Sequence, residues 1–317
     1  MRKIFGISLC VLVIFLSLHI GSTPLSWKNI WSGEGNDLFI LWSARIPRTI
    51  TVLLAGAGLS LAGLVMQTLT QNRFAAPDTI GTVESAKLGM LVAMIVLPNL
   101  SVVGEMMFTF LFASLGTLLF LFVSSKFPMK NQMLIPLLGV MYGNIIGGFG
   151  NFLAYRYDVL QNMSAWLQGN FSLVIEGQYE WIYLTFFLII GLYFFADYLT
   201  VARFGKEAAQ SLGLPFEWVM AIGTVLVSIT VSVILIVAGN LPFLGVIIPN
   251  LIAMRYGDYL RSTHQKIAFT GAMFLLVCDL LSRTLIRPYE IPVELILGIV
   301  AGTIFLVMLF RRVKAHE

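Results

Sequence analysis

The sequence predicts an all-α integral membrane protein, and three features of its composition and patterning support this fold class. Hydrophobic residues make up 58% and charged residues 11% of the 317 residues, and the mean hydropathy is +0.89. In soluble domains about a quarter of the residues are charged. Apolar segments of about 20 residues, the length that crosses a hydrocarbon core of ~30 Å as a helix, recur from end to end. No long polar stretch separates them, so we expect one membrane domain over residues 1–317 and no soluble catalytic domain.

Hydropathy, with Gly, Pro and charge clusters as boundaries, predicts about ten transmembrane helices. The first apolar segment follows Arg2 and Lys3 but lacks a small-x-small cleavage site, so we expect a retained helix rather than a signal peptide. The eighth segment is short and contains Pro249, so we expect it to span only part of the membrane. In chain order, the predicted helices cover residues 4–22, 49–70, 80–98, 104–124, 133–155, 179–199, 218–239, 243–256, 267–285 and 292–310.

The distribution of Lys and Arg over alternate loops predicts the orientation of these helices. One set of loops, which includes both termini, carries Arg2, Lys3, Arg73, Lys126, Lys130, Arg203, Lys206, Arg255, Arg261, Lys266, Arg311, Arg312 and Lys314. The opposite set carries Lys28, Arg45, Arg48, Arg156, Arg283 and Arg287, and Lys87 lies within the third helix. Because basic residues concentrate in cytoplasmic loops, we predict that both termini are cytoplasmic. The pI near 9.1 reflects these loops and gives no reason to expect nucleic-acid binding.

Four of the six basic residues on the predicted outer side form two local pairs, Arg45 with Arg48 and Arg283 with Arg287. Arginine stems can lie on apolar surface while their guanidinium groups reach the phosphate of membrane lipid. Alternatively, the planar guanidinium groups form a docking site for carboxylates of an external partner. Pro47 is expected to keep Ile46 extended and so to restrain the spacing of the first pair. Periodicity alone does not choose between lipid and partner.

Four stretches carry motifs that together resemble one family, the iron–siderophore and cobalamin permease subunits of bacterial ABC importers (FecCD-type). Residues 45–81 contain R-x-P-R, G-A-x-L-x-x-x-G-x-x-x-Q and N-x-x-A-x-P-x-x-x-G in that order. The stretches GKEAAQSLGLP (205–215) and PFLGVIIPN (242–250) are similar to the family's G-x-x-A-x-x-L-G and F-x-G-L-x-x-P-H segments. CDLLSRTLIRPYEIPVELILG (278–298) resembles its A-D-x-x-x-R and E-x-P-x-G elements. The resemblance is collinear over about residues 40–310.

The resemblance implies a type II ABC importer permease fold with ten helices and cytoplasmic termini in the bacterial inner membrane. It also implies a dimer of permeases, two cytoplasmic ATPase subunits and an extracytoplasmic solute-binding protein. The sequence variants are most similar to the subgroup that carries ferric catecholate siderophores, in which two different permeases commonly pair. We therefore favour a heterodimer over a homodimer and a ferric siderophore as the transported substrate. A cobalamin or haem importer is the alternative within the family.

Site residues follow from the resemblance position by position. The arginines that receive acidic residues of the binding protein correspond to Arg45, Arg48 and Arg283. The element that couples to the ATPase corresponds to Gly205, Glu207, Ala208, Ala209, Leu212 and Gly213. In this segment Gly213 is predicted to end a short helix, with Pro215 beyond it. The pathway and inner gate are predicted at Asn131, Gln132, Gly139, Gly143 and Gly147, although small residues on a membrane helix also serve plain helix packing.

The chain departs from the family pattern at a few positions. Asn250 replaces the usual histidine, Ala253 the usual arginine, and Glu294 the usual glycine. Glu84 and Lys87 stand where small residues are usual, and their i, i+3 spacing predicts an ion pair. Asp279 and Arg283 are four residues apart and are likewise expected to pair, whereas Glu294 has no helical partner and is expected near Arg283.

Other function classes fit the sequence less well. No G-x-x-x-x-G-K-[ST] phosphate loop occurs, so the chain is not expected to be an enzyme that hydrolyses ATP. An ion-coupled secondary transporter would need an inverted repeat and an acidic relay at the membrane midplane, and neither is clear. A membrane-embedded enzyme would need clustered His, Asp or Cys, but His19, His264 and His316 are far apart. Cys10 and Cys278 lie in apolar runs, so we expect no disulfide, metal site or cofactor.

Overall fold

The computed structural model describes residues 2–21, 25–32, 36–126, 134–177, 179–257, 260–286 and 289–314, and contains no β-strand within them. Each of the ten predicted segments forms a helix. These helices are α1 (Arg2–His19), α4 (Ile46–Leu69), α5 (Thr82–Val96), α6 (Val102–Ser124), α7 (Leu134–Arg156), α9 (Tyr183–Ala202), α11 (Phe216–Ala238), α12 (Leu244–Tyr256), α13 (Leu260–Thr284) and α14 (Val293–Lys314). Short helices lie between them: α2 (Trp27–Ser32), α3 (Asp37–Ile40), α8 (Leu160–Leu167) and α10 (Lys206–Ser211), with 3₁₀ turns at Phe171–Leu173 and Glu180–Ile182.

Six helical segments of the described chain are long and apolar enough to cross a membrane, which agrees with the predicted class of multi-pass helical membrane protein. Each of them contains one of the helices α4, α6, α7, α9, α11 and α13, or most of it. Parts of α1, α12 and α14 form shorter apolar helices. As the sequence predicts, α12 is short and carries Pro249 in its interior.

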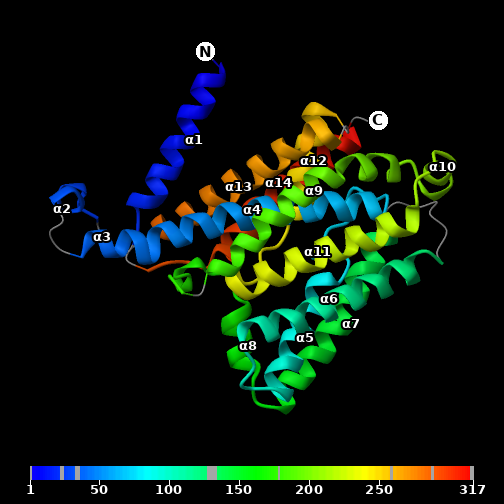
Figure 1. Cartoon of the computed structure of the whole chain (residues 1–317), viewed down its shortest axis with the longest axis horizontal. Helices are drawn as coiled ribbons and strands as arrows, with labels where there is room; N and C mark the ends of the chain where they lie inside the picture. Colours follow the sequence, from blue (N-terminus) through cyan, green and yellow to red (C-terminus); the bar gives the residue numbers. More distant parts are fainter. Residues whose placement is uncertain are drawn as a thin grey trace.

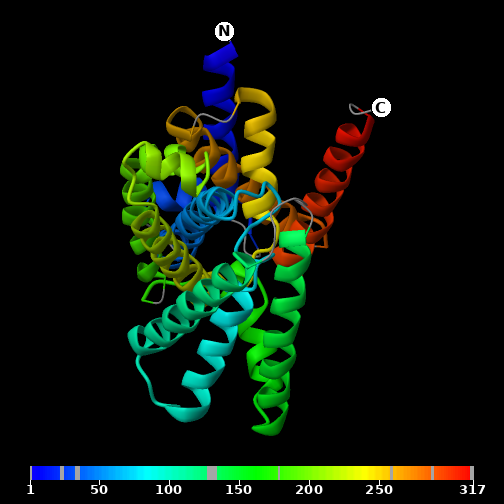
Figure 2. The same cartoon turned by 90° about the vertical axis from the view of Figure 1, so that its right-hand side faces the viewer.

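Helix α4 is the centre of the bundle (Figure 1). It packs against α9, α11, α12 and α13. In its apolar stretch of 18 residues, 83% of the residues are buried. In the apolar 18-residue stretches of α6, α7 and α9, only 22–28% of the residues are buried. These helices therefore present apolar side chains to the outside. Figures 1 and 2 both show α5, α6, α7 and α8 as a group that extends away from α1 and α13.

The chain enters α4 through a π-helical turn over Leu41–Arg45. The expectation that Pro47 keeps Ile46 extended is wrong, because Ile46 is helical with φ −65° and ψ −50°. A proline lacks the N–H that would continue an α-helical ladder. The wider π turn ahead of Pro47 changes the hydrogen-bond register at this point, so the helix continues through the proline and Arg45 and Arg48 lie on one continuous helical segment from Asp37 to Leu69.

Glycines allow α4 to approach its neighbours at backbone distance. A Cβ placed on Gly56 would lie 2.5 Å from the carbonyl oxygen of Gly271 in α13. A Cβ placed on Gly63 would lie 2.1 Å from the carbonyl oxygen of Gly245 in α12. In a membrane, apolar burial between helices gains little over contact with lipid, so such close packing supplies much of the association energy.

We predict that Gly63→Ala lowers the melting temperature of the purified protein in detergent, because the added methyl meets main-chain atoms that have no rotamer with which to move away. Overpacking of this kind typically costs about 1–3 kcal/mol. The matched control is Gly191→Ala in α9, where an added Cβ meets nothing within 4 Å. Equal melting of the two variants would contradict the close packing of α4 on α12.

Candidate functional site

One candidate site is a buried group of charges at the end of the bundle where α4 begins and α13 ends. We call this the arginine cluster and define it as Arg45, Arg48, Asp279, Arg283 and Glu290. Because α4 and α13 pack side by side, residues more than 200 positions apart in the sequence meet here. The three arginines predicted to dock the binding protein are therefore brought together, although their role in docking stays a prediction.

Two carboxylates hold the cluster together. Nη2 of Arg48 lies 2.8 Å from Oδ1 of Asp279, and Nη1 of Arg48 lies 2.7 Å from Oε2 of Glu290. Arg283 also donates to Asp279, which confirms the pairing predicted from their i, i+4 spacing. Burying a charge is tolerated only when it is paired and hydrogen-bonded, so Asp279 is the counter-ion that Arg48 and Arg283 share.

The first helix supplies the remaining acceptors. Nη1 of Arg283 donates to the carbonyl oxygens of Ser17 and Ile20, at 2.9 and 3.0 Å, and Nη1 of Arg45 donates to the same Ile20 oxygen at 2.8 Å. These carbonyls belong to the C-terminal turn of α1, where the helix has no partners of its own for them and where cations are favoured. The cluster therefore ties α1 to α4 and α13.

The arginines are turned inward in this structure. Arg45 and Arg48 are each 6% exposed and Arg283 is 2% exposed. The side chain of Glu290 is 17% exposed, whereas that of Asp279 is fully buried. Glu290 is thus the acidic member nearest the surface, and the hydroxyl of Ser172 donates to it. Arg287, the second basic residue of the local pair that begins with Arg283 in the sequence, lies outside the described residues.

Glu290 stays ionised at neutral pH. Burial alone would raise the pKa of its carboxyl, but the Arg48 guanidinium and the Ser172 hydroxyl outweigh burial and hold that pKa below its usual range. A carboxylate with a depressed pKa stabilises the fold above its unfolded pKa and loses this contribution as the pH falls through the folded pKa. The Glu290 contact is therefore intact at physiological pH.

A second candidate site is the short helix α10, which was predicted to couple to the ATPase. Gly205 precedes it with φ +94°, and a Cβ on Gly205 would lie 3.0 Å from Nε2 of Gln71. Gly213 follows it with φ +81°, as predicted for a helix end, and the N–H of Leu214 bonds to the carbonyl of Ala209 at 3.0 Å. Both glycines are needed for their backbone conformation.

The residues of α10 divide into a packed side and an open side. Ala209 is fully buried and anchors the helix to α9 and α11. Glu207, Ala208 and Leu212 are exposed. The segment therefore presents a small, well-anchored surface beyond the C-terminal end of α9 and the N-terminal end of α11 (Figure 1).

The glycines predicted to line the pathway lie on the side of α7 that faces α5. A Cβ on Gly139 would lie 2.2 Å from the carbonyl oxygen of Thr79, and one on Gly147 would lie 2.9 Å from Oε2 of Glu84. Gly143 is buried in the same contact. These glycines pack α7 closely against α5 and the turn that precedes it, within one subunit. The predicted gate residues Asn131 and Gln132 lie outside the described residues.

The structure assigns partners to several residues that depart from the family pattern. Lys87 donates to Glu84 at 2.8 Å, as their spacing predicts. Glu294 accepts hydrogen bonds from Asn240, at 2.8 Å, and from the N–H of Gly169, at 3.4 Å. These contacts tie the start of α14 to the residues that follow α11 and α8, and they occupy the carboxylate that was expected near Arg283.

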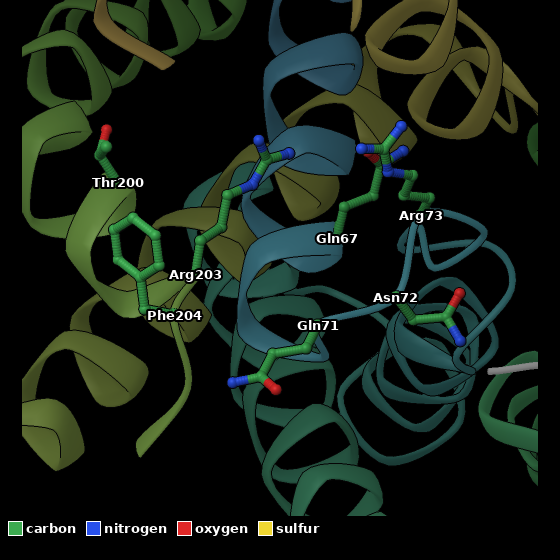
Figure 3. Close-up of a pocket in the computed structure, with 7 residues that line it drawn as sticks. All are labelled: Gln67, Gln71, Asn72, Arg73, Thr200, Arg203 and Phe204. Atoms are coloured by element: carbon green, nitrogen blue, oxygen red, sulfur yellow. The ribbon is translucent and has the colours of Figure 1, made fainter. Parts of the chain in front are cut away.

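A polar pocket lies near α10, between the C-terminal ends of α4 and α9 (Figure 3). Its volume is about 490 Å³. We call it the α4–α9 pocket, and it is lined by Gln67, Gln71, Asn72, Arg73, Thr200, Arg203 and Phe204. Sequence reasoning missed this pocket, because Arg73 and Arg203 were only counted as loop cations in two separate loops.

The backbone on the α4 side of this pocket is fixed by a Schellman motif. The N–H of Asn72 bonds to the carbonyl of Gln67 at 3.0 Å, and the N–H of Gln71 bonds to the carbonyl of Thr68 at 3.2 Å. Gln71 takes φ +50° here, a position that glycine usually fills. Nδ2 of Asn250 then donates to the carbonyl of Arg73 at 2.6 Å. Asn250 therefore fixes the backbone that carries Arg73.

Known proteins are similar to this chain in sequence and in architecture. Residues 9–311 match the FecCD transport family. The chain is 39% identical over 308 residues to the petrobactin import system permease protein YclN of Bacillus subtilis, with 97% of each chain covered. It is 36% identical over 299 residues to the ferric-anguibactin transport system permease protein FatD of Vibrio anguillarum, with 94% of this chain and 95% of that one covered. A solved structure described as a metal-chelate type ABC transporter in an inward-facing conformation matches with a TM-score of 0.81 and 25% identity over 98% of this chain and 100% of that chain.

We predict that the acids of the arginine cluster differ in their contribution to stability. Asp279→Asn leaves two buried guanidinium groups without their shared counter-ion, and losing one partner of a buried pair costs about 3–5 kcal/mol. Glu290→Gln should cost less, because water reaches that edge of the cluster. Melting curves of the isolated protein in detergent at neutral pH measure both, with Glu84→Gln as the control for a more exposed pair. An Asp279→Asn variant that melts like the parent would show that the cluster does not hold α1, α4 and α13 together.

Proposed function

This chain belongs to the FecCD transport family, and from that premise we propose that it is the permease subunit of an ATP-driven ABC importer for a ferric siderophore of the catecholate type. One observation carries the proposal: the two relatives described above, which match over nearly their whole length, are permeases for petrobactin and ferric anguibactin. Permeases of this family are not enzymes, so ATP hydrolysis falls to a separate subunit.

In this proposal residues 1–317 form one permease domain in the bacterial inner membrane, with both termini in the cytoplasm. The arginine cluster then faces outward and α10 faces the cytoplasm. The excess of Lys and Arg in the loops on the α10 side supports this orientation. The partners are a cytoplasmic ATPase dimer, a solute-binding protein and a second permease, for which we favour a different chain over a second copy.

We place the translocation pathway along α7, at the interface with the second permease. The gate is assigned to Asn131 and Gln132 and the lining to the helix that carries Gly139, Gly143 and Gly147. The limited burial of α7 supports this placement, because only 22% of its most apolar window is covered within the subunit. The glycines would act by holding α5 and its Glu84–Lys87 pair close to this open helix.

We assign ATPase coupling to α10 and its flanking residues Gly205, Glu207, Ala208, Ala209, Leu212 and Gly213. The support is geometric, because the helix is short, capped by glycine at both ends and anchored through Ala209, while its other side is open. A rigid surface of this kind can pass a movement of the ATPase on to the permease without changing its own conformation. Its contact with Gln71 through Gly205 links it to the end of the central helix.

We assign docking of the binding protein to the surface over Arg45, Arg48 and Arg283. Since these arginines already hold Asp279 and Glu290, an incoming carboxylate has to compete with an internal one. Glu290 is the group we expect to exchange, because its side chain is the more exposed of the two carboxylates and lies at the edge of the cluster, where it pairs with Arg48. Docking by this route is electrostatic and should weaken as salt is raised.

The coupling assignment predicts that Ala208→Trp abolishes siderophore uptake in vesicles that contain the whole importer, because a bulky side chain on the open side of α10 separates it from the ATPase. Iron uptake and ATPase stimulation by the binding protein are measured together. Asn99→Trp, on an exposed loop at the opposite end, is the control and should transport normally. A parallel sample with a catalytically inactive ATPase should transport nothing. Uptake that continues with the inactive ATPase would refute the proposed class of transporter.

The docking assignment predicts opposite effects from two substitutions in the arginine cluster. Glu290→Gln removes the internal competitor for Arg48 and should tighten binding of the solute-binding protein about three- to tenfold, equivalent to roughly 0.7–1.4 kcal/mol. Arg45→Gln removes a cation and should weaken binding by a similar factor. Affinities are measured in detergent at low and high salt, after the melting temperature has shown that each variant is folded. If neither substitution changes the affinity at low salt, the binding protein docks elsewhere.

A further inference from the structure

A further pocket lies at the end of the bundle that carries the arginine cluster. It is formed by the last turn of α11, the first turn of α6, and the last turn of α8 with the residues that follow it, and its volume is about 420 Å³. We call it the outer pocket. Its polar and aromatic lining residues are Glu105, Trp166, Gln168, Asn170, Tyr179 and Trp181. The docking, pathway and coupling assignments above leave it without a role.

Hydrogen bonds connect the outer pocket to the arginine cluster. Oδ1 of Asn170 accepts from the N–H of Ser172 at 2.9 Å, and the Ser172 hydroxyl donates to Glu290 of the cluster. On the other side, the N–H of Asn240, just beyond α11, bonds to the carbonyl of Leu167 at 2.9 Å. The wall of the pocket is therefore anchored at both ends, and a protein that covers the arginine cluster comes directly beside the pocket.

The charge of the outer pocket is negative. Glu105, a half-buried residue of α6, is the charged residue among those that line it. Glu176 and Glu180, both exposed, lie in the wall segment on either side of the lining residue Tyr179. Within the described part of the chain, none of these three acids forms an ion pair. A cation that entered the pocket would supply the counter-charge that a half-buried carboxylate favours.

The aromatic lining favours the same kind of ligand. Trp166 and Trp181 are 50% and 41% exposed, and the face of an indole ring attracts ammonium and guanidinium groups more strongly than other aromatic rings do. Tryptophan is common at membrane boundaries, and an acid in the first turn of a helix is favoured by the helix dipole. Neither tendency explains why two indoles and a carboxylate without a partner line one cavity beside a docking surface.

We propose that the outer pocket receives a lysine or arginine side chain of the solute-binding protein, held by the carboxylate of Glu105 and the rings of Trp166 and Trp181. The choice of this occupant rests on the docking proposed above, which brings the binding protein onto the neighbouring arginine cluster. The permease then offers two sites of opposite charge, one for acidic residues and one for a basic residue. Such a pair admits the binding protein in one orientation, because a rotated protein would bring like charges together.

Binding of the solute-binding protein to the purified importer in detergent tests this proposal. Glu105→Gln keeps the shape of the side chain but removes its charge, so it should weaken binding about three- to tenfold at low salt and less at high salt. Trp166→Leu should weaken binding by a similar factor. Trp166→Phe should weaken it less, because a phenyl ring keeps part of the attraction for a cation.

Asp158→Asn is the matched control for a general loss of negative charge. Asp158 is an exposed acid that follows α7 and does not line the pocket, and its φ of +57° is one that asparagine tolerates. This variant should bind like the parent. Melting temperatures show that each variant is folded before its affinity is compared.

A double-mutant cycle identifies the occupant. The lysines and arginines of the binding protein are changed to glutamine one at a time, and each variant is tested against the parent permease and against Glu105→Gln. One of these substitutions should weaken binding to the parent but have no further effect on Glu105→Gln, because the two groups lose the same contact. Effects that add fully for every lysine and arginine would show that none of them contacts Glu105.

The remaining outcomes separate this proposal from the docking assignment and from other occupants. If Arg45→Gln weakens binding and Glu105→Gln does not, the outer pocket is no docking site and the arginine cluster remains one. If neither weakens binding, both assignments are wrong. A Glu105→Gln effect confined to binding protein loaded with the ferric siderophore would make the pocket a site for a cationic group of the cargo. Loss of bound phosphatidylethanolamine from Glu105→Gln in native mass spectrometry, with unchanged affinity for the binding protein, would make it a lipid headgroup site.

Discussion

The backbone contact of α4 with α12 and α13 is the constraint on which the rest of the structure depends. A membrane helix gains little from hydrophobic burial against its neighbours, so it must gain from close packing and internal hydrogen bonds. Gly56 and Gly63 permit that packing because no side chain stands between the main chains. Both ends of α4 are placed by it. One end carries Arg48 into the arginine cluster, and the other carries Gln71 to the start of α10.

The arginine cluster shows how a functional surface can also be structural. The cluster holds three arginines and two carboxylates, so it keeps a net positive charge, and Arg45 finds its acceptor in the Ile20 carbonyl rather than in a carboxylate. A buried ion group of this kind adds little net stability compared with an apolar core, but losing one member leaves an uncompensated charge. A binding protein with acidic residues would therefore meet a positive region whose geometry is already fixed, and it would have to exchange with Glu290 rather than order free side chains.

Sequence reasoning located the helices and the short-range pairs because both depend on local pattern. The ten apolar segments, the Gly213 helix end and the pairs Glu84–Lys87 and Asp279–Arg283 are all visible within a few residues. The contact of Arg48 with Glu290 joins residues 242 apart, and the α4–α9 pocket joins two loops, so neither could be read from spacing. The expectation for Ile46 was wrong for a different reason. The π-helical turn ahead of Pro47 changes the hydrogen-bond register, so the helix continues where a proline ordinarily interrupts it.

The packing of α4 also limits how the subunit can change shape. A helix whose main chain touches that of two neighbours cannot bend or slide without separating them, because close-packed interiors transmit strain rather than absorb it. Movement within the subunit should therefore concentrate in helices with fewer buried residues. In the apolar 18-residue stretches of α6 and α7, 28% and 22% of the residues are buried. The arginine cluster and α10 sit at opposite ends of the rigid part. A signal between them is better carried by moving this part as a body than by deforming α4, which agrees with two-state motion of packed elements rather than gradual bending.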